Sequence, residues 1–253
     1  MRVRAPQIVA FGGGGFSMEA GNPLLDEFVL SLAGPRRRPR VCFIPTASGD
    51  ADHYVVRFYR AFSPARCEPS HVSLFRRDTG GGAVEGDLEA HLLSQDLIYV
   101  GGGSVLSLLG AWRAHGLDAI LHRAWERGVV LCGLSAGSLC WFSEAVTAFH
   151  GPPRRVEGLG MLPYSNCVHY DGEPARRAEY HRFVQEGMRP GYAAEDGAAL
   201  HFVGHDLQEV VSSRHGQRAY RVERRRGTVR ETPLEARYLG DEAACAPPLA
   251  TAR

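Results

Sequence analysis

Short apolar runs alternate along the chain with longer segments in which apolar residues recur every three or four positions. The runs consist of consecutive apolar or β-branched residues, as in strands that are buried on both faces. They are residues 7–11, 40–45, 72–75, 96–100 and 129–132. The intervening segments have helical spacing and are residues 23–33, 52–62, 88–93, 105–115 and 117–127. This alternation predicts an α/β fold with a parallel sheet flanked by helices on both faces.

The last hundred residues have a different pattern. Residues 174–186 read as a charged helix, and residues 208–213, 218–223 and 228–231 are short strand-like segments separated by turn residues. We therefore expect a small antiparallel C-terminal extension. No repeat or linker divides the chain, so residues 1–240 are predicted to form a single α/β domain. The Ala- and Pro-rich residues 241–253 are predicted to be a disordered tail.

Composition narrows the classes of protein that need to be considered. The formal net charge is +1, and 44% of residues are hydrophobic, so nothing favours a nucleic-acid or membrane partner. The six cysteines lack CxxC spacing, and the N-terminal residues lack a signal-peptide pattern. We expect a cytoplasmic protein with reduced cysteines, no metal and no organic cofactor.

The sequence GLSAG at residues 133–137 is the first candidate for chemistry. It follows an apolar run and precedes helix-forming residues, so it predicts a sharp strand-to-helix turn with Ser135 at the tip. Glycines suit such a turn because a Cβ on either side would clash. The alternative is an ordinary turn that happens to contain a serine.

Glycine clusters follow two other predicted strands. Gly12 to Gly15 lack the G-x-G-x-x-G order of a dinucleotide loop, so they indicate nucleotide binding only weakly. The cluster Gly101-Gly102-Gly103 ends the strand predicted next to that of Ser135. A backbone N–H from this cluster, together with that of Ala136, would form an oxyanion hole; otherwise these glycines serve tight turns.

A nucleophilic serine needs a base, and His169 is the preferred candidate among eleven histidines. It lies in a loop after an apolar segment and downstream of Ser135, the order found in α/β serine hydrolases. His150 and His201 are the rivals.

Five motifs along the chain resemble the dipeptidase E branch of the dipeptidase E/cyanophycinase serine peptidases. They are FIPTASGD, LIYVGGGS, GLSAGSLCWF, GLGMLPYSNCVHYDGEPARRAEYH and EDGAALHF. The resemblance covers residues 8–222 and implies a class I glutamine amidotransferase-like (flavodoxin-like) fold. It implies Ser135 as nucleophile, His169 as general base, and an oxyanion hole made by Ala136 with Gly102 or Gly103.

The sequence departs from these relatives at the third member of the triad. Where they commonly carry an Asp after the serine helix, this chain has Ala148. We expect another carboxylate to orient His169, with Glu157 as the first candidate and Glu144 and Asp171 behind it. The alternative for Glu157 is a surface carboxylate.

Substrate recognition is predicted from the residues that follow His169. Relatives that cleave after an N-terminal Asp need a cation for its side chain and an anion for the α-amino group, and Glu173, Arg176 and Arg177 suit those tasks. Glu173 and Arg177 also have the spacing of a helix-surface ion pair.

The expected function is that of a dipeptidase E-type serine peptidase that cleaves short peptides, with N-terminal Asp as one candidate preference. Its partner would be a small peptide, and a homodimer is one option for its assembly. Two alternatives stay open: a cyanophycinase-like hydrolase of β-aspartyl peptides, and a catalytically silent protein that binds a small amino-acid-like ligand.

Overall fold

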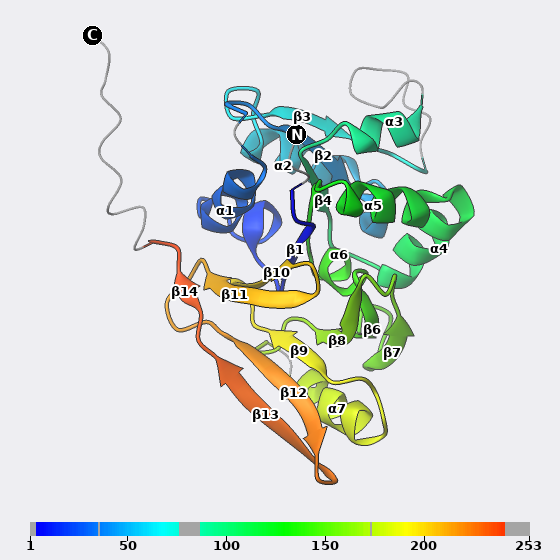
Figure 1. The fold of residues 1–253 in the computed structure, drawn as a ribbon, viewed down its shortest axis with the longest axis vertical. Coiled ribbons are helices and arrows are strands. Elements are labelled where there is room, and N and C mark those ends of the chain that lie inside the picture. Colours follow the sequence, from blue (N-terminus) through cyan, green and yellow to red (C-terminus); the bar gives the residue numbers. More distant parts are fainter. Residues whose placement is uncertain (1–3, 35, 76–86, 173, 241–253) are drawn as a thin grey trace.

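Two β-sheets organise the chain in the computed structural model, which describes residues 4–34, 36–75, 87–172 and 174–240. The predicted tail at residues 241–253 lies outside the described residues. The larger sheet has eight strands in the order β14-β11-β10-β1-β5-β4-β2-β3 (Figure 1). These strands are β1 (Gln7–Phe11), β2 (Arg40–Ile44), β3 (Glu68–His71), β4 (Leu97–Val100), β5 (Val130–Leu134), β10 (Ala198–Val203), β11 (Asp206–Ser212) and β14 (Arg237–Tyr238).

The predicted parallel sheet is correct for part of this sheet only. Strands β1, β5, β4, β2 and β3 run parallel, whereas β10 pairs antiparallel with β1 and with β11. The pairing of β10 with β11 follows from the connection between them, which is a tight turn at Gly204 (φ +59°). A two-residue hairpin can join only antiparallel strands. The sheet is therefore mixed.

A second, six-stranded mixed sheet has the order β13-β12-β9-β8-β6-β7. Its strands are β6 (Phe142–Thr147), β7 (Arg154–Glu157), β8 (Leu162–Cys167), β9 (Gly191–Ala194), β12 (Ala219–Arg225) and β13 (Thr228–Leu234). The expected antiparallel extension corresponds to the β12–β13 hairpin, which projects at the lower end of Figure 1 beside α7 (Pro174–Gln185). The segment expected at residues 208–213 belongs instead to β11 of the larger sheet.

Helices cover both faces of the larger sheet. The remaining helices are α1 (Leu24–Leu32), α2 (Asp52–Ala61), α3 (Leu88–Leu93), α4 (Val105–His115), α5 (Leu117–Glu126), α6 (Ala136–Leu139) and the 3₁₀ helices η1 (Gly15–Ser17) and η2 (Thr46–Ser48). On β1, Ile8 and Ala10 face the core under α4 and α5, whereas Val9 and Phe11 face the core under α1 and α2. Successive side chains of a strand point to opposite faces, so a continuous apolar run fills both cores.

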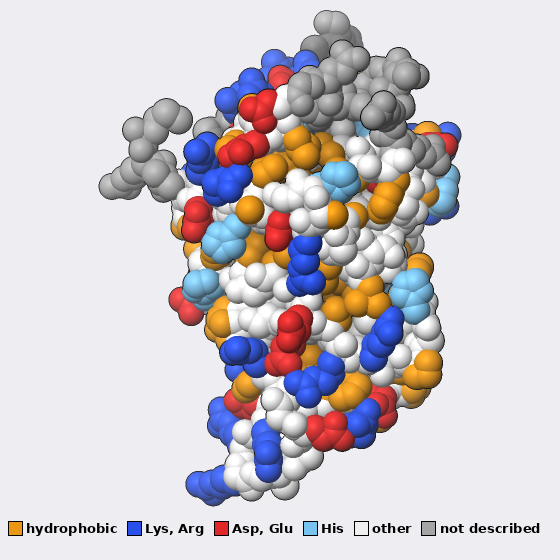
Figure 2. Space-filling view, turned by 90° about the vertical axis from the view of Figure 1, so that its right-hand side faces the viewer, with side chains coloured by type: hydrophobic (Ala, Val, Ile, Leu, Met, Phe, Trp, Pro, Cys, Tyr) orange, Lys and Arg blue, Asp and Glu red, His pale blue; other side chains and the backbone are white. Residues whose placement is uncertain are grey.

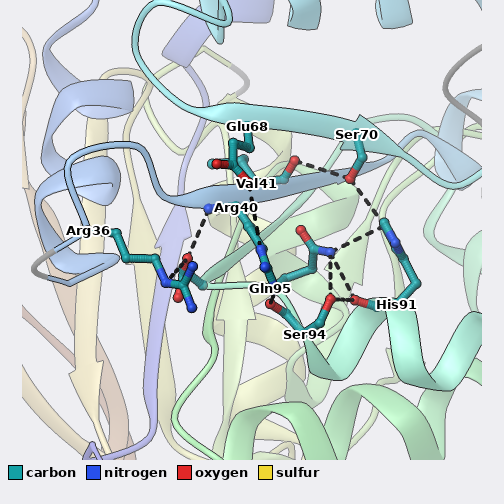
Figure 3. Close-up of polar contacts among 9 residues, drawn as sticks. Arg36, Arg40, Val41, Glu68, Ser70, His91, Ser94 and Gln95 are labelled. Atoms are coloured by element: carbon teal, nitrogen blue, oxygen red, sulfur yellow. Dashed lines mark hydrogen bonds and ion pairs between the residues drawn. The ribbon is translucent and has the colours of Figure 1, made fainter.

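At the edge of the larger sheet, polar contacts join β2 and β3 to the end of α3 (Figure 3). The Ser70 hydroxyl lies 3.1 Å from His91 Nε2, and the Gln95 amide donates to the His91 carbonyl at 2.9 Å. The Arg40 N–H donates to the Asp96 carboxylate at 2.9 Å. The expected strand at residues 72–75 is displaced to β3, whose Pro69 is tolerated because an edge strand leaves one side unpaired.

The surface carries charges of both signs, and the helices are short. On the face shown in Figure 2, basic and acidic side chains are interspersed. The longest helix in the described ranges, α7, has 12 residues, well short of the roughly 20 needed to cross a bilayer, and none of the described helices qualifies as a membrane span. Over the same ranges, no group of three or more His, Cys, Asp or Glu side chains could hold a metal ion.

One buried carboxyl on α1 should make stability depend on pH. Asp26 is 2% exposed, and burial raises its pKa from 3.8 to about 7. Between about pH 4 and pH 7 the unfolded chain releases this proton while the folded chain retains it, so the free energy of unfolding should fall as the pH rises. Asp26→Asn should remove this penalty and stabilise the protein by about 2 kcal/mol more at pH 8 than at pH 5. Urea unfolding of both proteins at the two pH values measures this, and an equal effect at both would contradict it.

Candidate active site

Ser135 lies at the tip of a sharp turn between β5 and α6. Its backbone has φ +52° and ψ −116°, a conformation that non-glycine residues rarely adopt. A Cβ on Gly133 would lie 2.4 Å from the Gly137 carbonyl oxygen, and one on Gly137 would lie 2.3 Å from that of Val100. Both flanking glycines are therefore required because the helix passes so close to β4 and β5.

His169 follows β8 and also has a positive φ, +53°. Its N–H donates to the Gly12 carbonyl at 3.1 Å, and the next N–H, of Tyr170, donates to the Ala194 carbonyl at 3.2 Å. These bonds fix the loop against both sheets. They place the imidazole Nε2 3.0 Å from Ser135 Oγ.

The other imidazole nitrogen, Nδ1, lies 2.6 Å from the Asp196 carboxylate. Asp196 lies between β9 and β10, where the chain passes from the second sheet to the larger one, and it forms a bridge with Gly13. Its own N–H donates to the Asp171 carboxylate at 2.9 Å. Ser135, His169 and Asp196 thus form a continuous chain of hydrogen bonds.

The first glycine cluster makes room for this contact. A Cβ on Gly13 would lie 2.0 Å from Asp196 Oδ1 and 3.0 Å from His169 Cε1, and one on Gly12 would lie 2.2 Å from the Glu195 carbonyl oxygen. The weak nucleotide-loop interpretation is thus replaced by a specific one: Gly12 and Gly13 allow the carboxylate and the imidazole to meet.

The expectation that Glu157 orients His169 is wrong in this structure. Glu157 lies on β7, paired opposite Glu144 on β6, and the carboxylate at Nδ1 is that of Asp196. Glu144 instead accepts from Arg155 at 2.6 Å and from the Arg189 N–H at 2.7 Å. Asp171, the third candidate, contacts the backbone of Asp196 rather than the imidazole. Position along the chain favours Glu157, but the topology of the two sheets brings Asp196 to the imidazole instead.

A local signal for Asp196 was present in the sequence. The motif Glu195-Asp196-Gly197 lies between the apolar segments that form β9 and β10, and Gly197 has φ +84°, as expected of a tight turn.

The two rival histidines are bonded elsewhere: His150 Nε2 lies 2.7 Å from Ser104 Oγ, and His201 Nε2 lies 2.8 Å from Gln7 Oε1.

The second glycine cluster lies beside Ser135. A Cβ on Gly102 would be 3.4 Å from the Ser135 Cβ. The Gly102 N–H donates to Tyr54 Oη at 3.0 Å, and burial raises the pKa of Tyr54, so the phenol stays protonated. Gly103, at φ +136°, packs against the Ala47 carbonyl.

A cavity of about 280 Å³ opens over the serine. Its wall comes from η1, α2, the second glycine cluster and the loop after β6. The lining residues are Ser17, Met18, His53, Tyr54, Arg57, Gly102, Gly103, Leu134, Ser135, Phe149 and His169.

The structure does not bring Arg176 or Arg177, two of the three expected substrate-binding residues, to this cavity. Glu173 lies outside the described residues. Arg176 is buried and donates to the Val168 carbonyl at 3.1 Å. Arg177 pairs with Glu231 and lies over the rings of Tyr170 and Tyr220, 5.2 and 5.1 Å from their centroids.

Comparisons with known proteins give consistent results. The model of peptidase family S51 matches residues 8–210. An uncharacterized peptidase of Bacillus subtilis, YgaJ, is 48% identical over 92% of this chain and 99% of its own length. Peptidase E of Streptomyces coelicolor is 29% identical over 65% of this chain and 68% of its own length.

The fold is likewise similar to that of solved structures. A peptidase from an acI-B1 actinobacterium superposes with a TM-score of 0.71 at 17% identity, covering 92% of this chain and 96% of that one. A Listeria monocytogenes structure described as peptidase E superposes with a TM-score of 0.57 at 18% identity, covering 82% and 98%.

Proposed function

Because the chain belongs to peptidase family S51 and is a serine peptidase, we propose that it cleaves short peptides in the manner of dipeptidase E, through an acyl-enzyme on Ser135. The observation that carries this proposal is the hydrogen-bonded series Ser135–His169–Asp196, with distances of 3.0 and 2.6 Å. A hydroxyl, an imidazole and a carboxylate in this order are the parts of a nucleophilic triad. The turn at Ser135 would then be a nucleophile elbow on a glutamine amidotransferase-like scaffold.

In the proposed reaction, Ser135 Oγ attacks the scissile carbonyl while His169 Nε2 takes the hydroxyl proton. The tetrahedral intermediate collapses when His169 returns this proton to the leaving amine, which leaves an ester on Ser135. A water molecule, deprotonated by the same nitrogen, then attacks the ester, and His169 returns the proton to Ser135 Oγ as the acid product leaves. Asp196 accepts from Nδ1–H throughout, which keeps Nε2 free to act and stabilises the imidazolium.

The oxyanion hole would use two backbone donors. The Ala136 N–H opens α6, where no preceding helical turn supplies an acceptor. For the second donor, Gly103 is preferred over Gly102, since the Gly102 N–H already donates to Tyr54. Removing one such donor from an acyl-transfer enzyme typically costs a few kcal/mol of transition-state stabilisation.

The small cavity supports short substrates. A volume of about 280 Å³ lies just below the usual range for ligand pockets. Peptide length is therefore expected to matter, with dipeptides and tripeptides preferred over folded chains.

A labelling experiment tests the proposal. A fluorophosphonate probe should attach to wild-type protein at Ser135, with loss of fluoride, and leave Ser135→Ala unlabelled. Wild-type protein should also release amino acids from a mixed dipeptide panel, whereas the variant should release none. Unlabelled wild type with no turnover above that of the variant would refute the peptidase mechanism.

A further inference from the structure

Two large apolar side chains are exposed at the rim of the cavity over Ser135. Phe149 is 59% exposed and Met18 is 44% exposed, and both line this cavity together with Ser135 and His169. They come from segments far apart in sequence: Met18 follows η1, and Phe149 lies between β6 and β7. Large apolar groups left exposed around a concave site are typical of a surface that binds a ligand.

Each of these side chains makes a contact that restricts it, a ring contact for Phe149 and a hydrogen bond for Met18. The Phe149 ring meets His150 edge-on with centroids 4.9 Å apart, and His150 Nε2 lies 2.7 Å from Ser104 Oγ. Ser104 directly follows the second glycine cluster and caps α4 by accepting from the Ser107 N–H at 3.2 Å. On the other side, Met18 Sδ accepts from the Gly14 N–H at 3.3 Å. A fixed apolar surface loses little entropy when substrate binds.

The charged groups around this cavity favour an acidic substrate less than the two apolar side chains favour an apolar one. Arg57 is the one arginine that lines this cavity among the described residues, and its guanidinium donates to the Ser17 carbonyl at 3.2 Å. Arg176 and Arg177, the cations expected to hold an Asp side chain, are engaged at Val168 and Glu231. The cavity thus offers two apolar side chains and a single exposed cation.

We propose that Phe149 and Met18 form an apolar subsite, and that preferred substrates carry a large apolar side chain next to the scissile bond rather than Asp. This inference rests on the proposed function and names its substrate class. The loop that lacks an acid at Ala148 would here supply a specificity residue, because the carboxylate of the triad comes from Asp196.

The test compares matched peptides in two series, with Leu, Phe, Ala or Asp placed either before or after the scissile bond. In at least one series, wild-type kcat/KM should be at least tenfold higher for Leu or Phe than for Asp. Phe149→Ala should lower kcat/KM for the apolar peptide by about tenfold, a typical loss for one hydrophobic contact. It should change the Ala peptide little. Phe149→Leu should restore most of the loss, and Met18→Ala should act in the same direction.

Leu106→Ala is the matched control, because Leu106 is exposed on α4, close in sequence to Ser104, yet does not line the cavity. It should leave the ratio of kcat/KM between the apolar and the Asp peptides unchanged in both series. Normal fluorophosphonate labelling with a preference for Asp, lost in Arg57→Gln, would overturn this inference while leaving the proposed function intact. Failure of both labelling and turnover would overturn the proposed function, and the inference with it.

Discussion

Asp196→Asn is expected to lower kcat for peptide hydrolysis by about three to four orders of magnitude, with little change in the fold. The carboxylate lies 2.6 Å from His169 Nδ1 and can only accept there, so it fixes the tautomer with Nε2 free to take the serine proton. An asparagine can turn its NH₂ toward Nδ1, which moves the proton to Nε2 and blocks the base. In another serine peptidase this change costs about ten-thousand-fold. Steady-state kinetics with one peptide, and circular dichroism of both proteins, measure the effect.

Glu157→Gln is the control for Asp196→Asn, because both changes convert a carboxylate into its amide. Glu157 lies on β7 away from the imidazole, so kcat should stay within about twofold of wild type, as for a surface substitution. Asp171→Asn should be intermediate, because an amide oxygen can still accept from the Asp196 N–H. A near-normal kcat for Asp196→Asn, or a collapse for Glu157→Gln, would assign the orienting role elsewhere.

Alanine at Gly133 or Gly137 is expected to destabilise the fold by about 3 kcal/mol or more, since overpacking against atoms that cannot move is costly. The new Cβ would lie 2.4 Å from the Gly137 carbonyl oxygen in the first case and 2.3 Å from the Val100 carbonyl oxygen in the second. These are backbone atoms of β4 and α6, so no side-chain rotation relieves the clash. Thermal unfolding should show a large drop in Tm, and expression should yield mostly insoluble protein.

Gly110→Ala is expected to stabilise the same chain and serves as the control for the two destabilising changes. Gly110 lies inside α4, and its Cβ would meet nothing within 4 Å. Alanine in an open helical position stabilises by about 0.5 to 1 kcal/mol. Should Gly133→Ala unfold at the same temperature as Gly110→Ala, the turn at Ser135 would be less tightly packed than described.

The parts of the fold that depend on local pattern could be predicted from the sequence. The predictions of the strand before Ser135, the turn at Ser135 and the histidine downstream rest on neighbouring residues, and the structure brings Ser135 and His169 together. The parallel strands were predicted from continuous apolar runs. The second sheet was not predicted, because β6, β7 and β8 mix polar with apolar residues and lack the continuous apolar runs that mark the parallel strands.

The residues that depend on long-range topology could not be predicted. Asp196 reaches His169 because the chain crosses from β9 to β10 beside Gly13, a contact between residues far apart in sequence. For Arg177 the sequence suggested substrate or the nearby Glu173, which lies outside the described residues, whereas the structure pairs it with Glu231 on β13, 54 residues away. Spacing along one element carries no information about which other element packs against it.

The candidate active site lies where the two sheets meet, because the chain passes from one sheet to the other between β9 and β10. The serine is carried by the larger sheet, the imidazole by the loop after β8 of the smaller one, and the carboxylate by the segment that passes between them. Neither sheet by itself carries all three of Ser135, His169 and Asp196. Peptide hydrolysis would therefore report how firmly the sheets are docked, since a small displacement between them would break the Ser135–His169–Asp196 hydrogen bonds while each sheet kept its own.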